Sequence, residues 1–127
     1  MASKALISIV DDDESVREAM KGLMRSLGLS AETFSSAEEF LTSNSLAHTA
    51  CLIADVQMSG MSGFNLHRRL VSSGRPIPTI LITAYPDQRM RTHALRSGVI
   101  DYLKKPVNEN ELLDCLSKVL GQTPTRS

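Results

Sequence analysis

The chain has 127 residues and a formal net charge of zero, with 42% hydrophobic and 22% charged residues. These values are typical of one globular domain and leave too little chain for two. The chain contains no basic block, which argues against direct nucleic-acid binding, because such binding draws most of its affinity from neutralised phosphates. Its apolar runs are far shorter than the roughly 20 residues that a membrane-spanning helix needs, so no membrane association is expected.

The beginning of the chain leads directly into a strand-like pattern, without the layout of a signal peptide. The two cysteines, Cys51 and Cys115, lie among apolar neighbours and lack metal-ligand spacing. Reduced core thiols are therefore favoured over a disulfide, and we expect a cytoplasmic protein.

Short apolar runs alternate with amphipathic segments along the whole chain. The expected elements of the first half are a strand at 5–10, a helix at 15–27, a weaker edge strand at 30–34, a short helix opened by a Ser36–Glu39 capping box, a polar connection at 43–49 and a strand at 51–55. The second half predicts a helix at 64–71 capped by Ser62, a strand at 77–82, a helix at 87–97, a strand at 99–103 and a helix from Asn108 to 120.

This alternation of five strands with five helices is typical of right-handed βαβ units and of a parallel sheet covered on both faces. The predicted class is therefore a doubly wound α/β fold. We expect one domain over residues 1–121, and residues 122–127 as a C-terminal tail or linker stub.

Polar side chains follow the carboxyl ends of four of the predicted strands. Asp11 and Asp12 follow the first strand, Asp55 ends the third, Thr83 the fourth and Lys105 the fifth. The carboxyl ends of parallel strands open on one rim, where open α/β sheets bind their ligands. We therefore expect these five side chains to converge.

Three carboxylates gathered at one place need compensation. At about 4 Å and an effective dielectric constant near 20, each like pair repels by roughly 4 kcal/mol, and one lysine cannot neutralise three charges. Mg²⁺ prefers such oxygen ligands. A carboxylate beside the cation can attack phosphorus to form an acyl phosphate, while a lysine and a hydroxyl bind the remaining phosphoryl oxygens.

The order and spacing of four motifs are specific. They are Val10-Asp11-Asp12, Asp55 with Met58, Met61 and Gly63, Ile82-Thr83-Ala84, and Tyr102 three residues before Lys105-Pro106. Over about residues 5–120 the chain resembles the receiver domains of two-component response regulators, including the chemotaxis regulators. Ser36–Leu41 has a close counterpart in the FixJ-type branch. The resemblance implies a flavodoxin-like fold with strand order 2-1-3-4-5.

By this resemblance, Asp55 accepts a phosphoryl group from a phosphohistidine of a sensor histidine kinase. Asp11 and Asp12 position Mg²⁺, with Asp55 and the backbone carbonyl of Gln57 as further ligands. The domain would then catalyse only its own phosphorylation and dephosphorylation and would not act as an enzyme on a separate substrate.

The resemblance also implies a switch. Thr83 and Lys105 contact the phosphoryl group, a cis Lys105–Pro106 bond places the ammonium, and Tyr102 swings inward when Thr83 moves. The face formed by the helix at 87–97, the fifth strand and the last helix would then bind a partner, either a second copy in a phosphorylation-dependent homodimer or an attached output domain.

One position departs from the family pattern. Many members have proline after the loop methionine, where this chain has Ser59 followed by Gly60. Proline restricts the unfolded chain by about 0.4–1 kcal/mol, so its absence should loosen the loop. The departure concerns loop rigidity and metal affinity rather than phosphorylation.

Two other interpretations remain open from the sequence. A phosphohydrolase of the haloacid-dehalogenase kind would use Asp11 and Asp13, but it needs a longer chain and leaves Asp55 without a role. A pseudo-receiver with an inactive site would have lost an acidic residue or the lysine, and this chain has lost neither. Identifying the phosphorylated aspartate separates the receiver interpretation from the phosphohydrolase. Mg²⁺-dependent labelling separates the receiver interpretation from the pseudo-receiver.

Only six residues follow Gly121, so no DNA-binding domain is expected in this chain. It is either a stand-alone receiver or the first part of a longer regulator, and the linker-like tail favours the second. The sequence does not identify the kinase or the signal.

Overall fold

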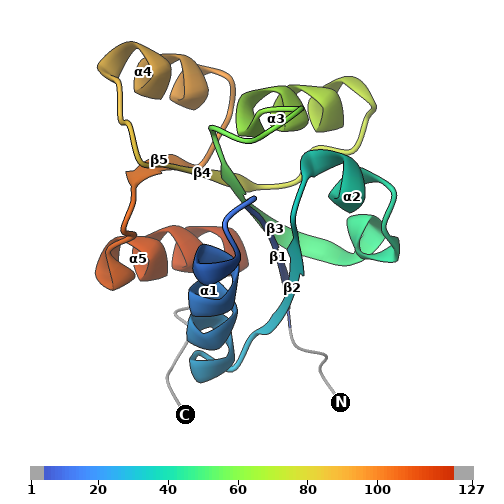
Figure 1. Cartoon of the computed structure of the whole chain (residues 1–127), viewed down its shortest axis with the longest axis vertical. Helices are drawn as coiled ribbons and strands as arrows, with labels where there is room; N and C mark the ends of the chain where they lie inside the picture. Colours follow the sequence, from blue (N-terminus) through green and yellow to red (C-terminus); the bar gives the residue numbers. More distant parts are fainter. Residues whose placement is uncertain (1–4, 122–127) are drawn as a thin grey trace.

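The computed structural model describes residues 5–121 and contains one five-stranded sheet (Figure 1). Its strands are β1 (Leu6–Val10), β2 (Ser30–Phe34), β3 (Thr49–Asp55), β4 (Thr79–Thr83) and β5 (Asp101–Lys104). All neighbouring strands pair in parallel, in the order β2-β1-β3-β4-β5. The predicted doubly wound α/β fold and the strand order implied by the resemblance are confirmed.

Helices cover both faces of this sheet (Figure 1). They are α1 (Glu14–Ser26), α2 (Ala37–Leu41), α3 (Gly63–Ser72), α4 (Gln88–Arg96) and α5 (Glu109–Leu120). Helices α1 and α5 lie on one face and α2, α3 and α4 on the other. A 3₁₀ helix, η1 (Asn44–His48), occupies the segment that the sequence predicts as a polar connection.

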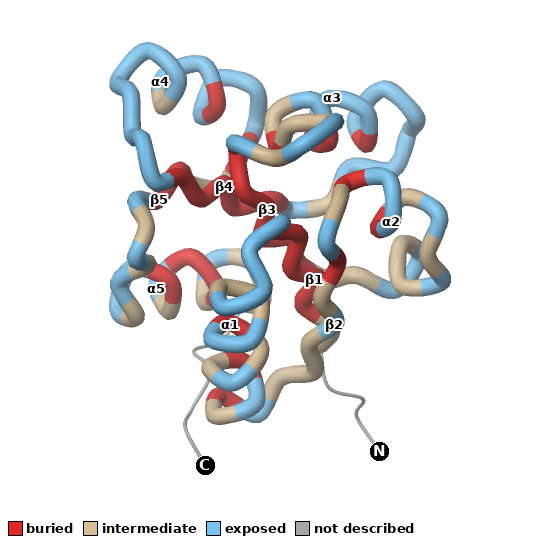
Figure 2. Tube along the Cα trace, viewed as in Figure 1, coloured by how far each residue is buried: buried red, intermediate tan, exposed pale blue. Residues whose placement is uncertain are grey.

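The central strand β3 shows why the chain folds in this way. Its residues from Cys51 onward are buried, because both faces of the sheet are covered (Figure 2). Ile53 belongs to the core on the α1 and α5 side, whereas Leu52 and Ala54 belong to the core on the other side. A continuous apolar run is therefore required here rather than an alternating one.

Side-chain caps set the starts of several helices. Ser62 and Asn108 accept backbone N–H bonds at α3 and α5, as expected. Ser36 likewise caps α2 by accepting from the Glu39 N–H at 3.0 Å. The predicted capping box also requires the Glu39 carboxylate to accept the N–H of Ser36, and this part is wrong. The Glu39 carboxylate accepts from the N–H and the hydroxyl of Ser35 instead.

The last two strands begin two residues later than the sequence predicts. Pro78 has no N–H to donate, so the regular pairing of β4 starts at Thr79. In front of β5, Ile100 still donates its N–H to the Thr79 carbonyl at 2.7 Å, but the strand itself starts at Asp101. The ends that carry the polar side chains are little affected by these shifts.

Both cysteines are free and buried, as expected. Burial raises the pKa of Cys51 to about 12. Burial and the neighbouring Asp101 raise the pKa of Cys115 to about 11. Within residues 5–121, no helix combines the length and apolar character needed to cross a membrane.

Gly63 allows α3 to start directly against the end of β3. A Cβ at this position would lie 2.6 Å from the Asp55 carbonyl oxygen and 3.0 Å from Leu81 Cδ2. We expect Gly63→Ala to lower the free energy of unfolding by about 1–3 kcal/mol, because the backbone of β3 must move. Gly22→Ala is the control, since nothing lies within 4 Å of its Cβ, and it should stabilise α1 by about 0.5–1 kcal/mol. Urea unfolding of both variants measures this, and a Gly63→Ala variant as stable as the wild type would contradict it.

His67 on α3 is 6% exposed, and burial lowers the pKa of its imidazole. The groups around the hollow beside it include the basic side chains Arg68 and His93. The His67 imidazole therefore takes up a proton near pH 6.5 in the unfolded chain but only at a lower pH in the folded chain. The free energy of unfolding should consequently fall as the pH drops below about 6.5. We expect the fall between pH 7.5 and 5.5 to be shallower in His67→Leu than in the wild type. The exposed His48→Gln is the control, and equal slopes for His67→Leu and the wild type in urea unfolding would contradict the expectation.

Candidate functional site

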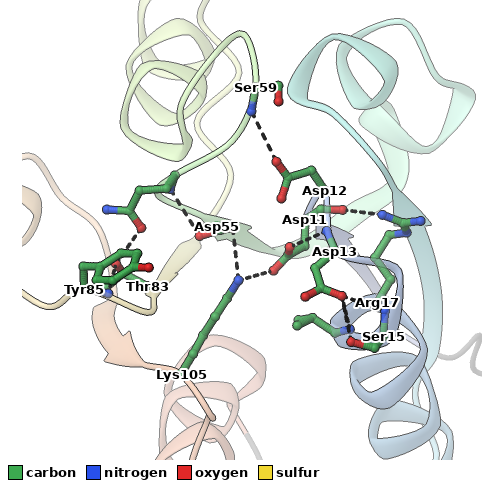
Figure 3. A network of polar contacts seen from close by, with 12 residues as sticks. Asp11, Asp12, Asp13, Ser15, Arg17, Asp55, Ser59, Thr83, Tyr85 and Lys105 are labelled. Carbon is green, nitrogen blue, oxygen red and sulfur yellow. Dashed lines mark hydrogen bonds and ion pairs between the residues drawn. The ribbon is translucent and has the colours of Figure 1, made fainter.

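The predicted polar side chains meet at one rim of the sheet (Figure 3). Asp11 directly follows β1, Asp55 and Thr83 are the last residues of β3 and β4, and Lys105 directly follows β5. Asp12 is the next residue after Asp11. The expected convergence is thus confirmed for all five, because parallel pairing brings the carboxyl ends of these strands to the same edge.

An ammonium between two carboxylates forms the centre of the site. Lys105 Nζ lies 2.8 Å from Asp11 Oδ2 and 3.0 Å from Asp55 Oδ2. The other Asp55 oxygen, Oδ1, accepts the N–H of Gln57 at 3.2 Å. The Lys105–Pro106 peptide bond is cis, as the resemblance implies. The Lys105 side chain thus connects the carboxyl ends of β1, β3 and β5.

The charges at this centre are not balanced. Burial raises the pKa of the Asp55 carboxyl, the Lys105 hydrogen bond lowers it in part, and the charge of Asp11 raises it further. Burial alone would lower the pKa of Lys105, but its bonds to Asp11 and Asp55 raise it above the ordinary value. The lysine therefore stays charged, while the carboxylates keep an excess of negative charge.

This excess suits a cation. Asp11, Asp12 and Asp55 each offer a carboxylate oxygen, and these oxygens lie within 4.8 Å of one another. Asp11 Oδ2 is buried and forms the 2.8 Å ion pair with Lys105 Nζ, and no further hydrogen-bond partner reaches it among the described residues. Oxygen donors, close spacing and uncompensated charge together fit the requirements of Mg²⁺.

Thr83 is connected to the centre through a residue whose side chain the sequence did not point to. Its hydroxyl donates to Gln57 Oε1 at 2.7 Å and accepts the N–H of Tyr85 at 3.0 Å. The resemblance had assigned a role only to the backbone carbonyl of Gln57. No sequence signal could have revealed the side-chain bond, because it depends on the rotamer of Gln57.

Tyr102 departs from the expected starting position. Its side chain is already inward, with the residue 3% exposed, and its hydroxyl accepts the N–H of Asp87 at 3.3 Å. The ring is held there because it packs in the core beneath α4. Next to it, Arg91 pairs with Asp101 at 3.3 Å and donates to the Tyr102 carbonyl at 2.7 Å. A hollow of about 440 Å³ between α4, β5 and α5 opens over this group.

Residues beside the site have structural roles. Asp13 caps α1 by accepting from the N–H groups of Ser15 and Val16, and the hydrogen bond from the Ser15 hydroxyl together with these N–H bonds lowers the pKa of its carboxyl. Lys104 is exposed, as expected. Arg17, which the sequence reasoning missed, donates to the Asp11 carbonyl at 2.7 Å and fixes the start of the acidic turn. Asp13 is thus used by the helix, which leaves the phosphohydrolase interpretation without its second aspartate.

Known proteins are similar to this chain in sequence. The response regulator protein TodT of Pseudomonas putida is 42% identical over 120 residues, which are 94% of this chain and 53% of TodT. Nodulation protein W of Bradyrhizobium diazoefficiens is 38% identical over 115 residues, 91% of this chain and 51% of that protein. The chain spans about half the length of these curated relatives.

Solved structures are similar to this chain in fold. A response regulator receiver protein from Burkholderia phymatum superposes with a TM-score of 0.80 at 39% identity, covering 95% of this chain and 98% of that one. The response regulator StyR gives a TM-score of 0.85 at 39% identity, covering 94% of this chain and 60% of StyR. Residues 7–117 match the family described as the response regulator receiver domain. The chain belongs to this family and is a receiver domain of two-component response regulators.

Proposed function

We propose that Asp55 is the phosphoacceptor of this receiver domain and takes its phosphoryl group from a phosphohistidine on a sensor histidine kinase. Asp11, Asp12, Asp55 and the Gln57 carbonyl would hold Mg²⁺. Bound there, Mg²⁺ offsets negative charge between the carboxylate and the incoming phosphoryl group. Thr83 and Lys105 would contact the phosphoryl oxygens.

The observation that carries this proposal is the contact of the Lys105 ammonium with Asp55 inside the carboxylate cluster. Asp11 shares the lysine but its side chain is fully buried, and Asp12 is exposed without a contact to the lysine. Asp55 combines the lysine contact and a place in the cluster with a side chain that is 5% exposed, compared with 0% for the Asp11 side chain.

The chemistry is a transfer between two nucleophiles. An Asp55 carboxylate oxygen attacks phosphorus, the phosphorus–nitrogen bond of the phosphohistidine breaks, and the imidazole nitrogen leaves with the bonding electron pair. Lys105, already held beside Asp55, can follow the phosphoryl oxygens without a large rearrangement. The domain catalyses its own phosphorylation and dephosphorylation and turns over no separate substrate.

The output would be a change of the face formed by α4, β5 and α5. In the present conformation the Thr83 hydroxyl is used by Gln57, so contact with a phosphoryl oxygen requires it to leave that partner. Moving a 1:99 equilibrium to 99:1 takes about 5.5 kcal/mol, and charge-assisted hydrogen bonds of roughly 1.5–3 kcal/mol each are of the right size. Because Tyr102 is already inward, the change would act on its surroundings, especially the Asp87 contact and α4.

The partner of this face is a second copy or an output domain. Residues 1–121 form the proposed receiver domain, and residues 122–127, which lie outside the described residues, are the proposed tail or linker stub. We place the domain in the cytoplasm and assign it no direct contact with nucleic acid.

Replacing Asp55 by asparagine should abolish labelling by acetyl phosphate, because the nucleophilic carboxylate is lost. Asp13→Asn is the matched control, since it makes the same change two residues from Asp11 on the cap of α1, and it should keep the labelling. Phosphate incorporation with and without Mg²⁺ measures both. Mg²⁺-dependent labelling that survives in Asp55→Asn would contradict the assignment.

Mg²⁺ affinity should depend on Asp12, because the cation loses a carboxylate ligand in Asp12→Ala. We expect a loss of about tenfold or more, at least the size seen when outer partners of metal ligands are removed. The exposed Glu18→Ala on α1 removes one negative charge away from the cluster and serves as the control. NMR titration with MgCl₂ gives the affinities, and equal values for Asp12→Ala and the wild type would refute the ligand role.

Binding of beryllofluoride, a phosphoryl mimic, should alter the NMR signals of Thr83, Tyr102 and α4 and change the sedimentation or partner binding of the domain. In Thr83→Ala the mimic should still bind at Asp55, but the signals of Tyr102 and α4 should remain as in the free protein. Signals that move only around Asp55 in the wild type would show that this face is not the switch.

A further inference from the structure

The loop between β3 and α3 makes a backbone contact with the acidic cluster. The N–H of Ser59 donates to Asp12 Oδ2 at 3.3 Å (Figure 3). Ser59 stands where the receiver pattern often has proline, and proline has no N–H to donate. The contact therefore exists because of the residue that departs from the pattern.

The same loop is fixed from its other side by α2. The N–H of Met61 donates to Glu38 Oε2 at 3.3 Å. Gly60, between the two donors, has φ +80°, and a Cβ there would lie 2.9 Å from that same Glu38 oxygen. The backbone at residues 59–61 thus lies between two carboxylates, and the turn at Gly60 directs one N–H to each.

We infer that the Ser59 N–H positions the Asp12 carboxylate for Mg²⁺. This inference rests on the proposed function, in which Asp12 is a metal ligand. With Oδ2 held by Ser59, the second oxygen of Asp12 points to the side of the site where Asp11 and Asp55 lie (Figure 3). Asp12 is exposed, so without this bond its side chain would have to be ordered when the cation binds.

The size of the effect follows from the kind of contact. Hydrogen-bond partners behind metal-ligating side chains are generally worth about 10–100-fold in metal affinity. The bond between Ser59 and Asp12 is long and exposed, so we expect about threefold to tenfold. The absence of proline, which from the sequence should loosen the loop and affect metal affinity, is thus offset by a contact that proline could not make.

The test compares Ser59→Pro with Ser59→Ala in an NMR titration with MgCl₂, with urea unfolding to check that each variant folds. Ser59→Ala keeps the N–H and should bind Mg²⁺ as the wild type does. Ser59→Pro removes the N–H and should bind about threefold to tenfold more weakly. Equal or tighter binding by Ser59→Pro would overturn the inference.

A double variant separates positioning from a general disturbance of the loop. In an Asp12→Ala background, Ser59→Pro should cause no further loss of Mg²⁺ affinity, because the carboxylate that the N–H positions is gone. An equal loss in both backgrounds would show a loop effect and overturn the inference. If Ser59→Pro does not fold, an α-hydroxy acid with the serine side chain at position 59 replaces the N–H by an ester oxygen without the proline ring, and it must also weaken Mg²⁺ binding.

Mg²⁺ binding and Asp55 labelling of the wild-type domain distinguish a failure of the proposed function from a failure of this inference. A wild-type domain that binds no Mg²⁺ would overturn both the proposed function and this inference. A wild-type domain that binds Mg²⁺ and is labelled at Asp55, with no difference between the alanine and proline variants, would overturn this inference alone.

Discussion

The contact of Lys105 with Asp11 and Asp55 is the interaction on which the site depends. It joins the ends of β1 and β3 to the segment after β5, with distances of 2.8 and 3.0 Å. It also leaves the site with more negative than positive charge, since Asp12 adds a third carboxylate at the same place. A site built in this way gains from a divalent cation and from a group, such as a phosphoryl, that brings anionic oxygens to the lysine and the cation together.

The carboxylate cluster and the face formed by α4, β5 and α5 are different parts of the fold. Helices α1 and α5 cover one face of the sheet, and α2, α3 and α4 cover the other (Figure 1). Two hydrogen bonds connect Asp55 with Thr83 at the end of β4. The N–H of Gln57 donates to Asp55, and the side chain of Gln57 accepts from the Thr83 hydroxyl. Thr83 ends β4 next to β5, which carries Tyr102 under α4. These bonds connect Asp55 with the end of β4, and α4 is the next helix after β4 in the chain.

The sequence predicted the parts that follow from periodicity and topology. Buried strands such as β3 are continuous apolar runs, and parallel pairing must bring Asp11, Asp55 and Lys105 to one rim. The missed features depend on rotamers and loop geometry that no residue pattern encodes. They include the side-chain bond of Gln57 to Thr83 and the N–H of Ser59 on Asp12. Tyr102 belongs to the same group, because its inward position depends on packing.

Locating the phosphoryl group on the unmodified chain tests whether Asp55 is the phosphoacceptor. The wild-type domain is treated with acetyl phosphate and MgCl₂, any acyl phosphate is reduced with borohydride to homoserine, and tandem mass spectrometry locates the converted aspartate. We predict homoserine at position 55 alone, and none when Mg²⁺ is withheld. Conversion at Asp11, Asp12 or Asp13, or no conversion at any aspartate, would contradict it.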